Sequence, residues 1–512
     1  MQWEDFADPV WITIAFSIVV PLVTYLLSRE SSQESRSHDI PWAPGKIPIL
    51  GHALSYRKSP SGFLLRACQS VGSCFQLNLA GKHMIIIAGA DAQRQIAKAP
   101  ERVLSARQAV ADIGFEETLG PLNVHQGTDL HKGIVKGIWQ HHATEQFIEW
   151  KTSLQQSLQR QVEESSSTGL VDFFQFIRRV ILRATIDRMI SPQFLVDNND
   201  RNNKNNGFLD QFMEFQDQLE DVTAKAVVLP RWIARPALLM PVRRKREQLQ
   251  EIITRRLNEL LESGAPTGFW LGQMHPRYST RDIAEYVVGL LFAAHKNPAI
   301  GAAQAYIMLH EHCSEKEKDL VQEEAKALLR FAATGGGPSG NDWNRDDTYL
   351  RRLCLETLRL TAHSIGAVRT VQEDFTIEVA QDSGKGDSST RKYLLPKGTS
   401  VGLTHITPSL NPQLWGPNAS TFSLDAHSME LYRDEYKFTT FSHGVHKCPG
   451  QQLAVVILQL TVALLLEDYV VELPAKIPHL SFERATLAQR EGPVMVKIQQ
   501  RQSSSSLNGQ AS

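Results

Sequence analysis

Uncharged apolar positions gather in a few long runs, and the first run lies almost at the N-terminus. Residues Pro9–Leu27 read PVWITIAFSIVVPLVTYLL, 19 residues without a charge, and a helix of that length spans a hydrocarbon core of roughly 30 Å. Acidic residues precede the run and Arg29 and Arg36 follow it, unlike the arrangement around a cleaved signal peptide. The pattern predicts a membrane anchor over residues 1–29, with the rest of the chain on the cytoplasmic side. A buried core helix is the alternative interpretation.

The residues after this run predict a stiff connection rather than a helix. Residues 41–52 read PWAPGKIPILGH, and each of the three prolines lacks a backbone N–H and fixes its own φ. We therefore expect a linker and proline-rich hinge over residues 30–52 and a large globular domain over 53–500. Residues 501–512 are polar and rich in serine, so we expect a disordered tail.

Helical periodicity dominates from about residue 130 onward. Residues 279–312 are apolar nearly all round in their middle, which predicts a helix through the core. The prolines of residues 230–241, PRWIARPALLMP, interrupt the helical pattern, and this segment is interpreted as a surface loop or a contact with a membrane surface. A mainly α fold with small β-sheets is predicted, with helices over 130–165, 171–190, 207–225, 241–263, 279–312, 319–334 and 347–362, and strands within 74–88 and 375–404.

Composition and charge argue for a globular protein and against a nucleic-acid-binding or disulfide-rich one. The chain has 512 residues, 42% of them hydrophobic and 21% charged, which is typical of a globular protein. A formal net charge of -1 argues against a nucleic-acid partner. Five cysteines without regular spacing argue against a disulfide framework and favour a reducing compartment.

Residues 441–450, FSHGVHKCPG, hold a cysteine directly before the apolar run LAVVILQLTVALLL. From the residues alone Cys448 is a metal ligand, a nucleophile, half of a disulfide or a small residue at a helix start. A zinc site usually needs several Cys or His ligands, whereas an axial thiolate on haem iron needs one cysteine. Gly444 permits a close backbone approach and Gly450 a tight exit, and the N-terminus of the following helix stabilises a thiolate.

This stretch resembles the haem-binding loop of the cytochrome P450 family, Phe-x-x-Gly-x-His/Arg-x-Cys-x-Gly. The resemblance implies a cytochrome P450 fold in which Cys448 is the axial ligand of haem b. It also implies that the loop residues Phe441, Gly444, His446 and Gly450 contact the cofactor, with His446 near a propionate.

Further stretches carry the same resemblance over roughly residues 41–500. Glu356 and Arg359 in LCLETLRL resemble the family's buried Glu-x-x-Arg pair, although a surface ion pair is the alternative interpretation. Arg369 in SIGAVRTV resembles the arginine that contacts a haem propionate. Lys132 and Lys136 in DLHKGIVKGIW resemble the basic pair of a helix above the haem, with a solvated helix face as the alternative.

The chain departs from the family pattern at two places. Where members carry Phe-x-Pro-x-Arg-Phe, this chain has TFSLDAHSM, with Ala426 at the arginine position and His427 beside it. The central helix carries AAHKNP, which places Lys296 and Asn297 where members carry an acid and an alcohol that deliver protons. We expect Asn297 to orient a water or an oxygen atom. Lys296 is the expected participant in proton transfer, with His295 as an alternative, and the other interpretation is that these side chains face away from the site. Pro298 is expected to open the helix locally.

The resemblance implies a membrane-anchored monooxygenase that uses O2 and electrons from NADPH through NADPH-cytochrome P450 reductase. Asparagine at this position is similar to a branch that includes sterol hydroxylases, prostacyclin synthase and the neighbouring sterol 14α-demethylases. The expected substrate is apolar, such as a sterol, a terpenoid or another secondary metabolite, and the expected location is the endoplasmic reticulum membrane. Two alternatives stay open: a haem-thiolate isomerase or dehydratase that needs no reductase, and a non-catalytic haem-binding protein.

Overall fold

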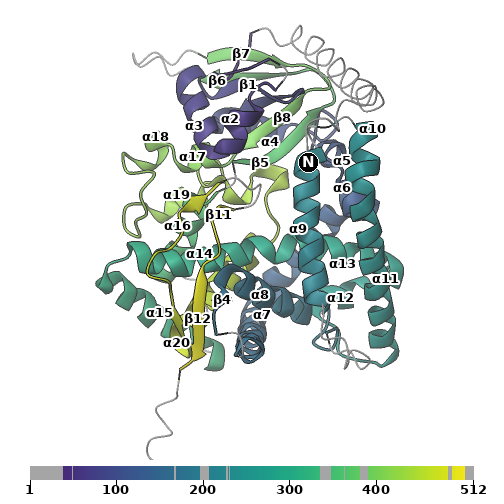
Figure 1. The fold of residues 1–512 in the computed structure, drawn as a ribbon, viewed down its shortest axis with the longest axis vertical. Coiled ribbons are helices and arrows are strands. Elements are labelled where there is room, and N and C mark those ends of the chain that lie inside the picture. Colours follow the sequence, from purple (N-terminus) through teal and green to yellow (C-terminus); the bar gives the residue numbers. More distant parts are fainter. Residues whose placement is uncertain are drawn as a thin grey trace, which may run out of the picture.

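A large helical body carries a smaller region of sheets at one end (Figure 1). The computed structural model describes residues 39–48, 50–166, 169–195, 207–226, 229, 231–334, 347–362, 364–380, 390–482 and 487–501. The expected anchor, residues 30–38 of the expected linker and residues 502–512 of the expected tail therefore lie outside the described residues. Within them the prediction of a mainly α fold with small sheets is confirmed.

The helical body is built around two helices that are buried along nearly their whole length. They are α14 (Lys296–His312) and α20 (Gln451–Asp468), and they pack against each other. Among the described residues, α20 is long and apolar enough to cross a membrane, yet 72% of it is buried, so it is a core helix. Around these two lie α7 (Thr128–Ser165), α8 (Phe173–Met189), α9 (Phe208–Ala226), α11 (Met240–Glu262), α12 (Phe269–Met274), α13 (Thr280–Ala294), α15 (Glu315–Thr334) and α16 (Tyr349–Leu360).

The predicted central helix is interrupted. It forms α13 and α14, which are separated by His295 with φ -116° and ψ -43°. Pro298 lies in the first turn of α14, where it lacks the N–H that would bond the carbonyl four residues earlier. The interruption therefore agrees with the local opening expected from Pro298.

The expectation for residues 230–241 is corrected, because this segment is helical rather than a loop. It forms α10 (Arg231–Ala234), the π-helical η4 (Arg235–Leu239) and the start of α11. Pro236 and Pro241 occupy the first turns of η4 and α11. The backbone stays helical through Ala234 and Leu239, so the two prolines lie within a continuous helical stretch that includes a π-helical turn.

The largest sheet has the strand order β1-β2-β8-β5-β3. The strands predicted within residues 74–88 are β1 (Cys74–Leu79) and β2 (Lys82–Ile87). They form a hairpin closed by Ala80 and Gly81, both at positive φ, as a tight two-residue turn requires. β2 pairs in parallel with β8 (Ser400–Thr404), and β8 pairs antiparallel with β5 (Ile365–Val371). The remaining strands are β3 (Leu104–Ser105), β4 (Val171–Asp172), β6 (Phe375–Ala380), β7 (Thr390–Leu395), β9 (Tyr469–Glu472), β10 (Leu480–Ser481), β11 (Gln489–Arg490) and β12 (Met495–Gln500).

Short helices connect the sheet to the helical body. The sheet side carries α2 (Ala53–Lys58), α3 (Pro60–Val71) and α4 (Ala90–Lys98) (Figure 1). The long segment between β8 and α20 holds the cysteine loop, so this segment joins the sheet to the core helix. The other short helices are α5 (Ala106–Asp112), α6 (Phe115–Thr118), η2 (Asn123–Gly127), α17 (Ile406–Ser409), α18 (Pro412–Trp415), α19 (Met429–Arg433), η6 (Thr439–Phe441) and η7 (Gly444–His446).

Candidate active site

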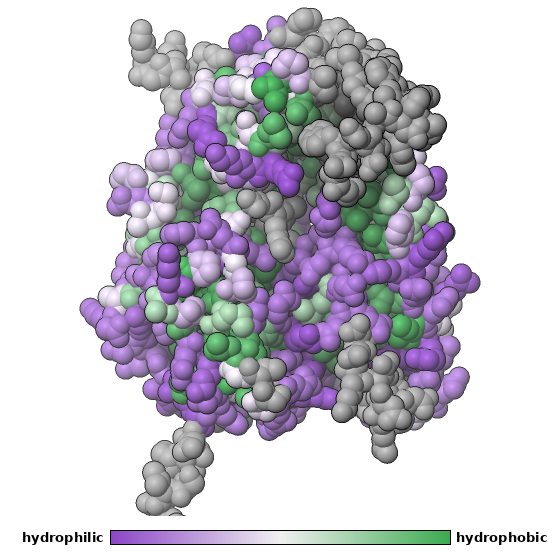
Figure 2. All heavy atoms as spheres, in the orientation of Figure 1, coloured by the Kyte–Doolittle hydropathy of each residue, from purple (hydrophilic) through white to green (hydrophobic). Residues whose placement is uncertain are grey.

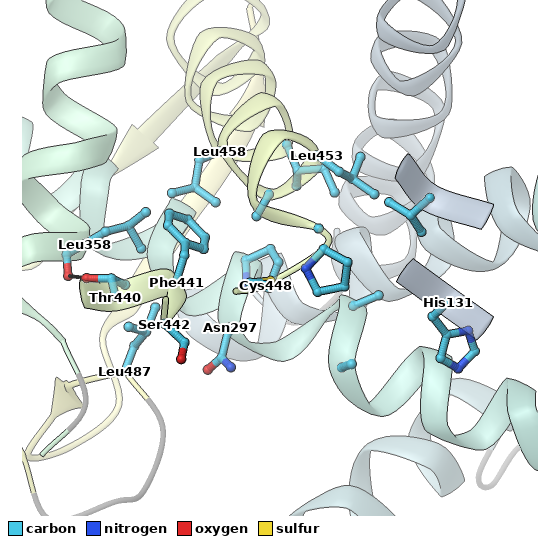
Figure 3. A pocket seen from close by; sticks show the side chains of 18 of the residues that line it. His131, Asn297, Leu358, Thr440, Phe441, Ser442, Cys448, Leu453, Leu458 and Leu487 are labelled. Atoms are coloured by element: carbon cyan, nitrogen blue, oxygen red, sulfur yellow. Dashed lines mark hydrogen bonds between the residues drawn. The ribbon is translucent and has the colours of Figure 1, made fainter. Parts of the chain in front are cut away.

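A cavity of about 370 Å³ lies between the interrupted central helix and the start of α20. The central helix contributes Asn297 and four apolar or small residues, and the cysteine loop contributes Cys448 (Figure 3). α7 contributes His131 from another direction. Most of the other lining side chains are apolar, among them Val135, Met189, Leu290, Leu358, Phe441, Leu453, Ile457, Leu458 and Leu487.

The cysteine loop holds Cys448 through its own backbone. The Cys448 N–H donates to the Phe441 carbonyl at 2.8 Å, and the Lys447 N–H donates to the Gly444 carbonyl at 3.1 Å. The Cys448 thiol is free and accessible because it faces the cavity, while the surrounding protein encloses the site. This burial raises the pKa of the thiol, with the Gly450 N–H acting in the opposite direction. A thiolate at this position therefore calls for a positive partner such as a metal ion.

The two glycines of the loop have different reasons to be glycine. Gly444 has φ +63°, and a Cβ there would lie 2.9 Å from the Ala97 Cβ in α4. Its need for glycine thus comes from backbone conformation and packing against α4, which sequence reasoning did not anticipate. Gly450 lines the cavity, and a Cβ there would meet no protein atom within 4 Å. The space beside Gly450 is therefore available to a ligand.

Glu356 and Arg359 form a fully buried pair on α16, with both side chains 0% exposed. Arg359 Nε and Nη2 each donate to one oxygen of Glu356 at 2.7 Å. The Tyr432 hydroxyl donates to Glu356 at 2.6 Å, a partner that sequence analysis missed. His427 Nε2 lies 3.8 Å from Glu356, too far for a hydrogen bond, so Tyr432 rather than His427 completes this brace.

Two threonines before the cysteine loop bond to neighbouring elements, one to α16 and the other to the residue before α17. Thr440 Oγ1 donates to the Leu358 carbonyl of α16 at 3.2 Å, and Thr439 Oγ1 donates to the His405 carbonyl at 3.0 Å. The brace and these two bonds together fix the polypeptide that leads into Cys448.

Basic side chains gather beside the cysteine loop. Arg369 is buried, and burial lowers its pKa to about 10. Its Nη1 donates to the Val368 carbonyl at 2.7 Å, whereas its Nη2 is buried without a hydrogen-bond partner in the described part of the chain. An unpaired buried guanidinium donor is costly, so this position suits an anionic ligand group such as a carboxylate.

The other predicted basic contacts have different environments. His446 lines the cavity, and its Nε2 lies 3.4 Å from Glu101. Burial, followed by the nearby Arg369 charge, lowers the pKa of His446, while Glu101 opposes the shift. Lys132 Nζ donates to the Val445 carbonyl at 3.2 Å and so holds the loop. Lys136 is exposed and does not line the cavity, which agrees with a solvated helix face.

His131 is a cavity residue that sequence analysis missed. Its Nδ1 accepts a hydrogen bond from Trp270 Nε1 at 3.1 Å, which leaves the proton on Nε2. Nε2 is buried without a hydrogen-bond partner among the described residues, and burial lowers the pKa of His131 to about 4. The only available sequence signal was its place directly before Lys132.

Lys296 and Asn297 point in different directions. Asn297 lines the cavity, and its Oδ1 is buried without a hydrogen-bond partner in the described chain. Lys296 does not line the cavity, and its Nζ donates to Asp217 at 2.8 Å and to Glu220, both on α9. Of the two interpretations of Lys296, its position agrees with the one in which the side chain faces away from the cavity.

Comparison with known proteins supplies the class of the molecule. The family model described as Cytochrome P450 matches residues 41–498. The chain belongs to the cytochrome P450 family. It is an oxidoreductase of the monooxygenase type, and the cofactor of the family is haem with an axial cysteine thiolate.

Individual relatives of this P450 are distant. Cytochrome P450 monooxygenase pynD of Aspergillus niger is 22% identical over 512 residues, covering 94% of this chain and 97% of its own. Cytochrome P450 26B1 of Mus musculus is 23% identical over 492 residues, covering 91% and 88%. Cytochrome P450 4A10 of Mus musculus is 27% identical over 217 residues, covering 42% and 38%. These names do not support the expected nearness to the sterol demethylase and prostacyclin synthase branch.

The cavity of this P450 fits haem on three independent observations. An accessible thiol, Cys448, faces the cavity, and the glycine side of the loop at Gly450 leaves open space. His131 Nε2 in the cavity wall and Arg369 Nη2 beside the cysteine loop are buried donors without protein partners in the described chain, and the two propionates of haem are acceptors of the kind such donors need.

Proposed function

We propose that this P450 inserts one oxygen atom from O2 into an apolar small molecule at a haem held by Cys448. The observation that carries the proposal is that Cys448 and Asn297 line one cavity whose walls are mostly apolar. When bound, haem supplies the activation of O2, and the axial thiolate favours cleavage of the O–O bond.

The residues around the cavity have distinct roles in this proposal. Cys448 binds the iron, and the brace of Glu356 and Arg359 keeps its loop in place. Arg369 and His131 would each donate a hydrogen bond to a carboxylate of the cofactor, since both offer buried donors, and the Arg369 cation would neutralise its charge. His446 and Lys132 support the loop at the same edge.

Asn297 is proposed to orient oxygen or water in the cavity. No carboxylate occurs among the described lining residues, and an amide donates and accepts hydrogen bonds but does not release a proton at neutral pH. In this proposal Asn297 holds a water by its free Oδ1, and that water carries the proton.

A membrane location and an electron-transfer partner complete the proposal. Trp232 in α10 is 61% exposed and Leu54 in α2 is 58% exposed, and α2 and α10 lie toward the same end of the molecule (Figure 1). Most of the visible surface is hydrophilic, with separate hydrophobic patches (Figure 2). Exposed aromatic and aliphatic side chains suit a membrane surface. We propose the endoplasmic reticulum membrane as the location, NADPH-cytochrome P450 reductase as the electron donor, and a sterol, terpenoid or other secondary metabolite as the substrate.

A haem-thiolate isomerase or dehydratase is the second candidate, because the amide of Asn297 suits a reaction that needs no proton from the protein. Purified protein is incubated with a panel of sterols and terpenoids, with and without NADPH and reductase, and product masses are measured. Monooxygenase activity predicts a gain of one oxygen atom that requires both additions. A product formed without them, of unchanged mass or lacking one water, supports the second candidate. Haem-loaded protein without turnover on any panel member contradicts both.

Asn297→Ala and Asn297→Gln separate the role of the amide from that of the cavity shape. We expect Asn297→Ala to lower the product formed per NADPH consumed while haem content is retained, with partial recovery in Asn297→Gln. Equal coupling in wild type and Asn297→Ala removes Asn297 from the mechanism.

A further inference from the structure

Five buried or half-buried polar side chains meet at the break between α13 and α14, directly beside Asn297. They come from three elements and are called here the break clamp: Arg178 of α8, Asp217 and Glu220 of α9, His295 at the break, and Lys296 at the start of α14. None of them lines the cavity, so the proposed function gives them no role.

The imidazole of His295 has a single protonation state that fits its neighbours. Its Nδ1 lies 2.6 Å from the Leu291 carbonyl, and since a carbonyl only accepts, Nδ1 carries the hydrogen. Nε2 is then an acceptor, and Arg178 Nε lies 3.4 Å away as its donor. A second proton on Nε2 would oppose the guanidinium, so His295 is a neutral group that satisfies a carbonyl at the end of α13.

Arg178 connects His295 to α9. Its Nη1 donates to both oxygens of Asp217, at 2.9 and 2.8 Å, and its Nη2 donates to the Met213 carbonyl at 3.1 Å. The same Asp217 accepts from Lys296 Nζ at 2.8 Å. The contacts therefore form a closed ring that leaves the backbone at His295, passes through α8 and α9, and returns at the next residue, Lys296.

The charges of the break clamp balance. Two cations, Arg178 and Lys296, face two carboxylates, Asp217 and Glu220, and His295 is neutral. Arg178 and Lys296 are nearly fully buried, while Asp217 reaches the surface in part. A buried charge pair with satisfied hydrogen bonds constrains geometry more than it adds stability. The break clamp is therefore suited to holding the backbone at His295 and Lys296 in one conformation.

We infer that His295 and Lys296 are positioning residues, and that the break clamp fixes the backbone at the α13–α14 break and so holds the Asn297 amide in the cavity. Asn297 follows Lys296 directly, so any rotation of the backbone there moves the amide away from the space above Cys448. This inference rests on the proposed role of Asn297.

Amide hydrogen exchange tests the clamp without any turnover. In Lys296→Met we expect exchange of the amides of residues 291–297 and 299 to rise about tenfold, because the ring through α9 is broken, with other helices unchanged. Lys296→Arg keeps the charge and should restore most of the protection. The matched control is Lys225→Met, since Lys225 pairs with Asp221 on α9 at 2.6 Å with both side chains exposed, and it should behave as wild type. Wild-type exchange at 291–299 in Lys296→Met overturns the inference.

A double-mutant cycle tests whether the clamp acts through Asn297. Lys296→Met should lower the product formed per NADPH in the wild-type background and lower it no further in the Asn297→Ala background. Equal losses in both backgrounds overturn the positioning role. If wild type itself shows no NADPH-dependent product, the proposed function fails, whereas the exchange experiment still decides whether the clamp holds the break.

A milder variant keeps the inference testable if Lys296→Met does not fold. Glu220→Gln removes one of the two acceptors of Lys296 and leaves Asp217 in place. We expect a local rise in exchange of about threefold at residues 291–299, with the reduced carbon-monoxide spectrum of thiolate-ligated haem retained. No local rise in this folded variant also overturns the inference.

Discussion

Replacing Arg359 by lysine should keep the positive charge of the buried brace but remove some of its hydrogen bonds. Arg359 Nε and Nη2 span the two oxygens of Glu356. Its Nη1 donates to the Ser409 carbonyl at 2.6 Å and also to the Ala419 carbonyl. The three donors of a lysine sit on a single atom, so one ammonium group cannot reach both Glu356 and the two carbonyls. At least two of these bonds are lost in Arg359→Lys.

The size of the effect follows from burial. Both side chains of the pair are 0% exposed, so water cannot replace the lost partners. A hydrogen bond to a charged group contributes about 1.5–3 kcal/mol, and two such bonds give a loss of about 3–6 kcal/mol. Breaking a buried ion pair costs about the same, 3–5 kcal/mol. Against a total stability of about 5–15 kcal/mol, the variant should fold but retain less haem.

The measurement is urea unfolding followed by far-ultraviolet circular dichroism, together with the haem content of the purified protein. Arg160→Lys is the control, because Arg160 and Glu164 form an ion pair at 3.3 Å on α7 with both side chains well exposed. A change of under about 0.5 kcal/mol is expected there. A loss of less than about 1 kcal/mol in Arg359→Lys would refute the reasoning, since it lies well below the contribution of two charged hydrogen bonds.

Three further predictions concern the thiolate, acidity and the surface. Cys448→Ser should remove the red-shifted Soret band of the reduced carbon-monoxide complex that thiolate ligation produces; a retained band would exclude Cys448 as the ligand. Burial and then Arg178 lower the pKa of His295 from 6.5 to about 3, so the unfolded chain takes up the proton first as the pH falls. The contribution of neutral, buried His295 to the free energy of unfolding is complete above pH 6.5. Below pH 6.5 that contribution falls by about 1.4 kcal/mol for each pH unit. His295→Gln should therefore flatten the pH dependence of the unfolding free energy between pH 6.5 and 5, and parallel curves would contradict the assignment. In protein lacking the expected anchor, residues 1–29, Trp232→Ser should weaken flotation with phospholipid vesicles while the haem spectrum is unchanged; undiminished flotation of this variant would show that α10 does not contact the membrane.

Local patterns were sufficient to predict much of the fold. The strands expected within residues 74–88 are β1 and β2, and helical periodicity located α7, α8, α9 and α11 to within a few residues. The prolines of residues 230–241 misled the prediction, because the helical stretch continues past Pro236 and Pro241 with a π-helical turn between them. The sequence shows that a proline is present but not which turn of a helix it occupies.

The site was predictable where the residues follow one another in the chain. Cys448, Phe441, Gly444 and Gly450 lie within ten residues and share one loop. Tyr432 was not predictable, because its bond to Glu356 spans 76 residues and depends on how α19 packs against α16. A side chain that completes a buried site from a distant element leaves no periodic signal in the sequence.

The Lys296 side chain points toward α9 for a physical reason. The same reason explains why this chain has lysine at 296 and asparagine at 297, where the family has an acid and an alcohol. The family's acid at this position would, in this chain, face Asp217 and Glu220, and three carboxylates in a half-buried site repel one another. Lysine satisfies both α9 carboxylates and is drawn away from the cavity. The cavity side of the break is then left to Asn297, whose neutral amide needs no counter-ion between apolar walls. The charges on α9 and the residues of the central helix therefore have to be interpreted together, and a change at Lys296 alone leaves α9 with uncompensated negative charge.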